Sequence, residues 1–383
     1  MTDLVKNILY IGGFELPDKN AAAQRVIANA KLLRDLGYNV VLFGTDKSYQ
    51  ANDLKNSYKS INDFDTYSIP YPKTIKHWVK YVTSINNTLE LIKLTNIKFD
   101  FIITYNFPAL SSMKILKYCK NNKINTISDC TEWYNHKPNN IMGIIKFLDS
   151  ELRIRYFNKK YDGLICISRY LFDYYKDVNN KIQLPPLVDL EDEKWKVKIL
   201  PKRDKSILVY AGSPGGKDKI NLLIDSMIKI DKISKLIEFR VFGISKEEYY
   251  LKYNYHKIIE NSIDEFVLFL GKIPHKKVIE EITNADFSAF IRENTRVNNA
   301  GFPTKFVESI SCGTPVITNR TSNLDDYLIN YKNGFFLEDN SYQGLEKIIQ
   351  KNIKQVDNSI FSYKIHIGEF KQLLNNIYNQ TKS

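Results

Sequence analysis

The chain has 383 residues, of which 43% are hydrophobic and 26% are charged, and its formal net charge is +12. This is the composition of a globular protein, and the length suits two domains of ordinary size. No apolar stretch is long enough to cross a bilayer and no leader-like run follows Met1, so we expect a cytoplasmic protein. The four widely separated cysteines lack the spacing of metal ligands or of a disulfide framework, and we expect them to pack as small apolar groups.

The excess of positive charge indicates either an anionic partner or a biased composition. No nucleic-acid-binding signature accompanies the lysines, so we expect no nucleic-acid partner. Peripheral contact with an anionic membrane is the better functional interpretation. The alternative is a compositional bias, since the lysines are mixed with many asparagines and isoleucines.

The first half of the chain alternates strand and helix patterns. A strand at 8–11 ends at Gly12 and Gly13, and a helix at 21–36 and a strand at 40–43 follow. This order begins a parallel α/β sheet, in which the carboxyl ends of the strands face a cleft. Gly12 and Gly13 are therefore predicted to let a substrate approach the backbone, and the alternative is a simple tight turn.

Residues 71–82 interleave lysines with Ile75, Trp78, Val79 and Val82. At helical spacing this pattern gives an apolar stripe flanked by cations, which suits the surface of an anionic membrane. The alternative is a surface helix whose stripe packs on its own domain.

Two acidic residues, Asp129 and Glu132, follow a strand predicted at 125–128. Glu132 lies beside Trp133 and Tyr134, where partial desolvation would fit its carboxyl for acid or base work on an acceptor hydroxyl. We place Asp129 with it as a catalytic candidate. The alternative for Glu132 is a loop acid beside a core tryptophan. Other elements of this half are expected at 101–104 (strand), 115–119 (helix) and 163–168 (strand).

The segment from Pro185 to Asp189 is predicted to leave this domain for a charged linker. We therefore expect an N-terminal Rossmann-like domain at 1–190, a second one at 200–360 and a helical segment at 361–383. The fold class is α/β with two Rossmann-like domains and an interdomain cleft. The second half is expected to contain strands at 207–210, 239–243, 267–271 and 287–290, and a helix at 220–230.

A glycine-rich loop follows the first strand of the second half. Gly212 and Ser213 offer backbone donors there, and Lys217 and Lys219 add two ammonium groups, which together suit a diphosphate. The loop does not have the Walker pattern. The alternative is a solvated surface loop.

A second anion site is predicted where a helix begins after Gly301 and Phe302. Its N-terminal N–H groups attract phosphate, and Thr304 and Lys305 add a hydroxyl and a cation. Glu308 lies one turn further, where a carboxylate would accept hydrogen bonds from ribose hydroxyls. The alternative is an ordinary helix start with a solvated glutamate.

Residues 286–335 resemble the donor-binding half of the retaining GT-B glycosyltransferases of group 1, a family that includes many makers of bacterial capsule, O-antigen and other surface glycans. Glu308 matches the second glutamate of the family motif, and residues 313–316 match its Gly-Thr-Pro-Val ending. Ala300 stands where the family has its first glutamate. The resemblance implies that Lys219 binds the donor diphosphate. We expect the stretch that contains Arg292, Glu293 and Arg296 to replace part of the role of the missing glutamate.

The resemblance further implies an N-terminal domain that binds the acceptor, a second domain that binds the nucleotide sugar, and a last helix that crosses back to the first domain. The implied reaction moves a sugar, with retention, from a UDP- or GDP-sugar to a growing, lipid-linked cell-surface glycan at the inner face of the cytoplasmic membrane. We expect no cofactor and no metal, because no Asp-x-Asp motif ends a strand and neighbouring Asp325 and Asp326 would diverge on a helix. The alternatives are a sugar-nucleotide epimerase of the same fold and a degenerate binding subunit, which Ala300 keeps open.

Overall fold

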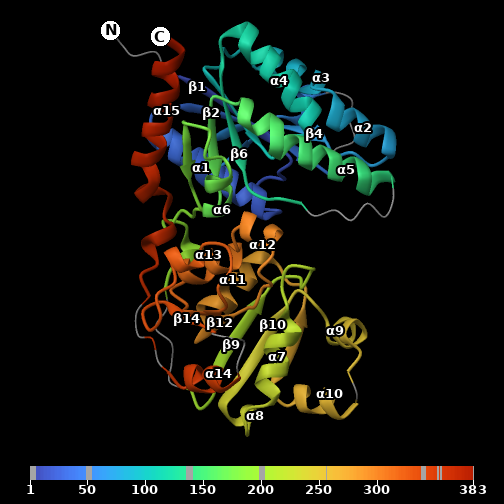
Figure 1. Cartoon of the computed structure of the whole chain (residues 1–383), viewed down its shortest axis with the longest axis vertical. Helices are drawn as coiled ribbons and strands as arrows, with labels where there is room; N and C mark the ends of the chain where they lie inside the picture. Colours follow the sequence, from blue (N-terminus) through green and yellow to red (C-terminus); the bar gives the residue numbers. More distant parts are fainter. Residues whose placement is uncertain are drawn as a thin grey trace. The chain divides into compact units, whose positions relative to one another are not determined.

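The structure is a computed structural model that describes residues 6–48, 54–134, 141–197, 203–255, 257–337, 342–351, 353 and 356–382. The chain forms two compact units (Figure 1). Unit 1 comprises Met1–Val188, Ala300–Phe302 and Tyr363–Ser383, and unit 2 comprises Asp189–Asn299 and Pro303–Ser362. The predicted start of the second domain, residue 200, lies outside the described residues. The predicted roles of the two domains, and the cleft between them, stay predictions.

Within the described residues, unit 1 contains an eight-stranded sheet in the order β3-β4-β2-β1-β5-β6-β7-β8, parallel except between β3 and β4. Its strands are β1 (Asn7–Gly12), β2 (Asn39–Asp46), β3 (Lys59–Ile61), β4 (Phe64–Pro70), β5 (Phe101–Tyr105), β6 (Asn125–Cys130), β7 (Gly163–Cys166) and β8 (Lys181–Gln183). Its helices are α1 (Ala21–Asp35), α2 (Ile75–Thr83), α3 (Asn86–Thr95), α4 (Ala109–Asn122), α5 (Ile141–Leu152), α6 (Arg169–Tyr174) and α15 (Ile367–Lys382).

The sheet of unit 1 has a hydrophobic core on each face, because alternate residues of a strand point to opposite sides. Ile8 and Tyr10 of β1 pack with residues of α1 and α15, and Leu9 and Ile11 pack with residues of α3 and α4. The C-terminal helix α15 is thus part of the core of unit 1, to which it adds Phe370, Leu373, Leu374 and Ile377.

Helix α1 shows why the local sequence folds as it does. The side chain of Asn20 accepts a hydrogen bond from the Ala23 N–H at 2.9 Å and caps the helix start. The chain leaves the helix through Gly37, whose φ of +89° favours glycine. The predicted helix at 21–36 is confirmed to within one residue.

Within the described residues, unit 2 contains a six-stranded parallel sheet in the order β11-β10-β9-β12-β13-β14. Its strands are β9 (Ser206–Ala211), β10 (Ile237–Phe242), β11 (Val267–Gly271), β12 (Phe287–Ala289), β13 (Val316–Thr318) and β14 (Gly334–Phe336). Its helices are α7 (Ile220–Ile228), α8 (Ile233–Leu236), α9 (Lys246–Tyr253), α10 (Lys257–Asp264), α11 (His275–Thr283), α12 (Arg296–Ala300), α13 (Thr304–Ser311) and α14 (Tyr342–Ile349).

The predicted α/β class with two Rossmann-like sheets is confirmed. The hairpin of β3 and β4 at the sheet edge was not predicted, because its polar residues and short strands give no buried-strand pattern. The four cysteines are free and buried, as predicted. Among the described residues, no helix is both long enough and apolar enough to span a membrane.

Candidate functional site

Unit 2 contains a cavity of about 600 Å³ beside the carboxyl end of β9, the place where open α/β sheets bind ligands. Three segments line it: the loop after β9, the region around the start of α11, and the first two turns of α13 together with Arg292. The lining residues are Ala211, Gly212, Ser213, Gly215, Gly216, Lys217, Asp218, Ile273, His275, Val278, Arg292, Thr304, Lys305 and Glu308.

A buried ionic cluster forms one wall of this cavity. Asp218 is hydrogen-bonded and ion-paired to the Lys305 ammonium through one carboxylate oxygen and to Arg292 Nε, at 2.7 Å, through the other. Tyr210 donates its hydroxyl to the same carboxylate at 2.9 Å. Two cations thus share one anion, and the wall retains one unit of positive charge.

The pKa values of the cluster follow from burial and from these charges. Burial alone raises the pKa of the Asp218 carboxyl, but Lys305 and Arg292 outweigh it and lower that pKa to about 2. Burial lowers the pKa of the Lys305 ammonium to about 8, against the attraction of Asp218. A further anion placed in the cavity would stabilise the charged form of Lys305.

Two glycines hold the loop after β9 against this cluster. Gly212 has a φ of +138°, and a Cβ added to it would lie 3.1 Å from Lys305 Nζ. Gly243, after β10, has a φ of +98°, and a Cβ there would lie 2.5 Å from the carbonyl carbon of Gly212. Both positions require glycine, for conformation and for space.

Replacing Gly243 by alanine is expected to destabilise unit 2 by at least about 2 kcal/mol, from backbone strain and the clash with Gly212. Hydrogen exchange is expected to quicken in peptides of β9 and β10 and to stay unchanged in those of β1 and β5. Gly215→Ala is the matched control, because a Cβ at Gly215 meets no described atom within 4 Å. Equal protection of β9 in both variants would contradict this account.

The second wall of the cavity carries Glu308 and His275. Glu308 lies one turn into α13, and its Oε1 is hydrogen-bonded to His275 Nε2 at 3.0 Å. His275 begins α11, which follows β11 after a short loop. Among the described residues, no side chain caps the N-terminus of α13, whose first residues, Thr304 and Lys305, face the cavity. Backbone N–H groups at such a helix start attract anions.

The structure brings together six of the predicted donor-binding residues: Gly212, Ser213, Arg292, Thr304, Lys305 and Glu308. Sequence reasoning did not single out His275 or Asp218. Both follow the carboxyl end of a strand, which is the signal that could have found them.

Lys219, predicted to bind the diphosphate, is not a lining residue of this cavity. Its backbone N–H donates to Ile291 O at 2.8 Å, and its Nζ lies 3.0 Å from Glu293 Oε1. Of the two predicted lysines, Lys305, carried by α13, is the one in the cavity wall. The role of Lys219 stays a prediction.

Gly12, Gly13, Gly301 and Phe302, also predicted to bind the donor, belong to unit 1. A Cβ on Gly12 would lie 2.7 Å from the carbonyl oxygen of Tyr105, so this glycine is required by the close approach of β5. Gly13 is exposed. Gly301 and Phe302 are buried.

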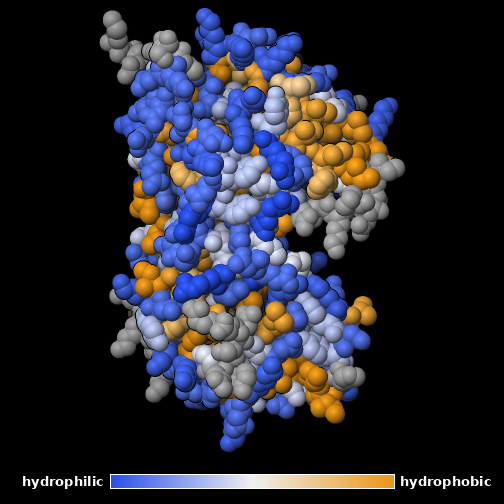
Figure 2. Space-filling model, in the orientation of Figure 1, coloured by the Kyte–Doolittle hydropathy of each residue, from blue (hydrophilic) through white to orange (hydrophobic). Residues whose placement is uncertain are grey.

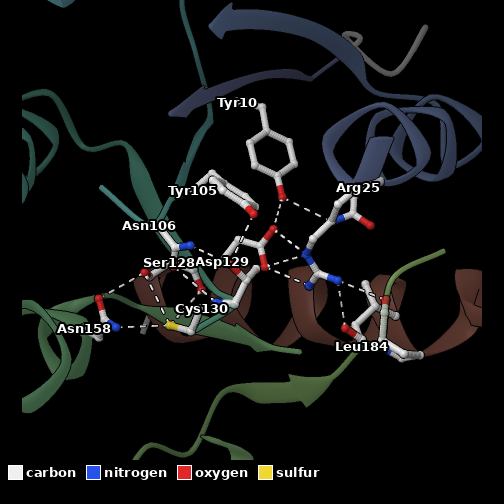
Figure 3. A network of polar contacts seen from close by, with 12 residues as sticks. Tyr10, Arg25, Tyr105, Asn106, Ser128, Asp129, Cys130, Asn158 and Leu184 are labelled. Carbon is white, nitrogen blue, oxygen red and sulfur yellow. Dashed lines mark hydrogen bonds and ion pairs between the residues drawn. The ribbon is translucent and has the colours of Figure 1, made fainter. Parts of the chain in front are cut away.

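Asp129 is fully buried at the carboxyl end of β6 (Figure 3). Arg25 reaches both of its oxygens, with Nη2 at 2.8 Å from Oδ1, and Tyr10 donates its hydroxyl to Oδ2. Arg25 also donates to the carbonyl oxygens of Leu184, at 3.0 Å, and Pro185, at 2.9 Å. Asp129 is thus enclosed by side chains of its own unit, which suits a carboxylate that positions its neighbours. Its predicted catalytic role stays a prediction.

Glu132 lies two residues beyond β6 and is partly buried. It accepts a hydrogen bond from the hydroxyl of Tyr134. Trp133 is 2% exposed and donates its indole N–H to Glu151 at 2.9 Å, so it is a core residue. The predicted acid-base role of Glu132 stays a prediction.

Among the described residues, no group of three or more His, Cys, Asp or Glu side chains has the arrangement of a metal site. Asp325 and Asp326 lie in a short 3-10 helix, Leu324–Asp326. Metal independence stays a prediction.

Comparison with known proteins places this site in a family. Residues 191–359 match the family described as "Glycosyl transferases group 1". An uncharacterized glycosyltransferase of Methanocaldococcus jannaschii is 22% identical over 246 residues, which cover 58% of this chain and 60% of that protein. The match thus spans less than two thirds of the length of this relative.

Solved structures show the same fold over nearly the whole chain. The catalytic domain of starch synthase IV from Arabidopsis thaliana, bound to ADP and acarbose, has a TM-score of 0.71 at 10% identity and covers 98% of this chain and 99% of its own. Sucrose-phosphate synthase from Thermosynechococcus elongatus has a TM-score of 0.65 at 16% identity and covers 98% and 100%. Anabaena HepE in complex with UDP-glucose has a TM-score of 0.64 at 13% identity and covers 97% and 99%. Residues 191–359 are therefore similar to the group 1 glycosyltransferases, in a chain whose two Rossmann-like units have the GT-B fold.

Proposed function

We propose that this protein transfers a sugar from a nucleotide-sugar donor to an acceptor, with the donor bound in the cavity of unit 2. The observation that carries the proposal is the cluster of Lys305, Arg292 and Asp218, which shares a cavity with Glu308 and the N-terminus of α13.

The cluster suits the leaving group of such a reaction. Transfer of the sugar leaves a nucleoside diphosphate, whose developing negative charge needs cations and N–H donors that are already in place. Lys305 and Arg292 supply the charge, and the backbone of the loop from Gly212 to Asp218 and of the start of α13 supplies donors.

Glu308 is proposed to accept hydrogen bonds from the ribose hydroxyls. Its Oε1 is hydrogen-bonded to His275, which orients the carboxylate in the cavity wall, and we propose that Oε2 meets the ribose. Ribose is common to UDP- and GDP-sugars, and the base and the sugar of the donor are left open by this contact.

This chain differs from the family motif at its first glutamate, where it has Ala300. Ala300 is buried, and its carbonyl oxygen accepts a hydrogen bond from Ser168 Oγ at 2.9 Å. Arg292 lines the cavity, whereas Glu293 is paired with Lys219. We propose that Arg292 takes over part of the contact with the donor, near the diphosphate.

For the acceptor we propose a growing, lipid-linked surface glycan, such as a capsule or O-antigen chain, elongated with retention at the inner face of the cytoplasmic membrane. This rests on the family resemblance of residues 286–335. A sugar-nucleotide epimerase and a degenerate binding subunit are the competing functions.

The test is the thermal stability of the whole chain with UDP, GDP and ADP. The matching nucleotide is expected to stabilise the folded protein by about 2.7 kcal/mol at a concentration of 100 Kd. Glu308→Ala is expected to weaken binding about 10- to 100-fold, by loss of hydrogen bonds to a charged group, and to reduce turnover with it. If no nucleoside diphosphate raises the melting temperature, the proposal fails.

Product analysis separates the competing functions. A transferase releases a nucleoside diphosphate only when an acceptor is supplied. An epimerase changes the nucleotide sugar without releasing the diphosphate, and a binding subunit is stabilised by the nucleotide and forms no product.

A further inference from the structure

Unit 1 carries a solvent-exposed apolar stripe along α5 and the turn that follows it. Ile144, Leu148, Leu152 and Tyr156 recur every fourth residue, a spacing that places side chains in one line along a helix. All four are exposed. An amphipathic helix that packed on its own domain would bury such a line.

Two neighbouring helices extend this stripe into a surface. Helix α4 adds exposed Leu110 and Met113, and helix α2 adds exposed Ile75 and Val79. The eight side chains are between 40% and 67% exposed. Figure 2 shows hydrophobic residues gathered over this part of unit 1. We call these eight residues the α2–α4–α5 face.

Specific contacts hold the three helices together. Ser111 Oγ of α4 donates to Tyr81 O of α2 at 3.2 Å. The Ala109 N–H, at the start of α4, donates to Asp149 Oδ1 of α5 at 2.8 Å. Lys146 Nζ of α5 lies 4.9 Å from the ring centre of Trp78 in α2. The face is therefore one surface of unit 1.

Residues 71–82 were predicted either to face a membrane or to pack on their own domain, and helix α2 has one side suited to each. Trp78 is partly buried and packs edge-on against Tyr71 and Tyr81. Ile75 and Val79 remain exposed. One side of the helix thus packs on its own domain, and the other side adds to the face.

The exposed charges beside the face are positive, and the two acidic residues of α5, Asp149 and Glu151, are partly buried and hydrogen-bonded. Lys76 and Lys80 of α2, Lys114 and Lys117 of α4 and Lys146 of α5 are all exposed. Helices α2 and α4 contain no acidic residue. A second copy of the chain seated here would bring these lysines near their own equivalents, and like charges oppose that contact.

We propose that the α2–α4–α5 face docks on a membrane surface that contains anionic lipids. The apolar side chains would enter the boundary between headgroups and acyl chains, and the lysines would pair with lipid phosphates. This interaction is independent of the donor cavity, which lies in unit 2.

The test is co-sedimentation of the full chain with phosphatidylcholine vesicles made with and without phosphatidylglycerol. We expect binding that requires phosphatidylglycerol and weakens with salt. Leu148→Glu/Leu152→Glu is expected to weaken binding at least about tenfold, because two leucines that would become buried in the bilayer are lost. Leu251→Glu/Ile258→Glu is the matched control, since these residues of unit 2 are 87% and 81% exposed and lie outside the face.

Lys76→Gln/Lys80→Gln provides a second variant that leaves the apolar face intact, and we expect about fivefold weaker binding for each lysine lost. An unchanged urea midpoint of unit 1 in both face variants shows that the fold is retained. Nucleotide-induced stabilisation is measured separately on unit 2, so a failure of the docking proposal is distinguishable from a failure of the donor site. Binding unaffected by Leu148→Glu/Leu152→Glu would overturn the proposal. So would a dimer in light scattering that this variant dissociates and that does not bind vesicles.

Discussion

Replacing Lys305 by methionine is expected to lower kcat/KM about 100- to 1000-fold, the usual cost of removing one group that stabilises a developing anion. The ammonium is buried in the cavity wall, where water screens it little, and within the part of the chain that the structure describes no other cation pairs with the same oxygen of Asp218. Methionine has a similar length and keeps the packing, so the change removes mainly charge. Steady-state kinetics and calorimetric titration with the diphosphate measure the effect.

Lys219→Met is the matched control for this prediction. Lys219 follows the same loop but is paired with Glu293 and does not line the cavity, so we expect less than about a threefold change, the effect of a surface ion pair. The free nucleoside, which lacks the diphosphate, should bind equally to Lys305→Met and to the unmodified protein. A larger loss in Lys219→Met than in Lys305→Met would restore the original assignment of the diphosphate ligand.

Much of the fold could be predicted from the sequence because its signals are local. A buried run of β-branched residues, a glycine turn and a capped helix recur through both halves, and each can be recognised within about 15 residues. The start of α13, with Glu308 one turn into the helix, was predicted from the same kind of local signal. The loop from Gly212 onward was found because glycines before a helix suit an anion.

The pairing within the site was not predictable, because it depends on contacts between distant segments. Lys305 and Asp218 are 87 residues apart, and Arg292 and Asp218 are 74 apart. Which of two lysines enters the cavity is decided by the direction of a side chain on a folded helix. The exposure of Leu148 and Leu152 is a similar case, since their spacing equally suits a helix buried in its own domain.

Replacing Arg25 by methionine is expected to lower the free energy of unfolding of unit 1 by about 3–5 kcal/mol, because it leaves the buried carboxylate of Asp129 without its cation. Arg25 and Asp129 are 2% and 0% exposed, and Arg25 also holds the chain at Leu184 and Pro185. Urea unfolding followed by tryptophan fluorescence measures this. In a Trp195→Phe background, the remaining tryptophans, Trp78 and Trp133, both report on unit 1.

Arg34→Met, in the last turn of the same helix, is the control, and we expect a loss below about 1 kcal/mol because Arg34 is exposed. Asp129→Asn should destabilise unit 1 about as much as Arg25→Met, and the double variant should lose less than the sum of the two. Asp129→Asn also decides between a positioning and a catalytic residue. Turnover that falls only as unit 1 unfolds fits positioning, whereas turnover abolished with the urea midpoint unchanged would return Asp129 to the reacting atoms.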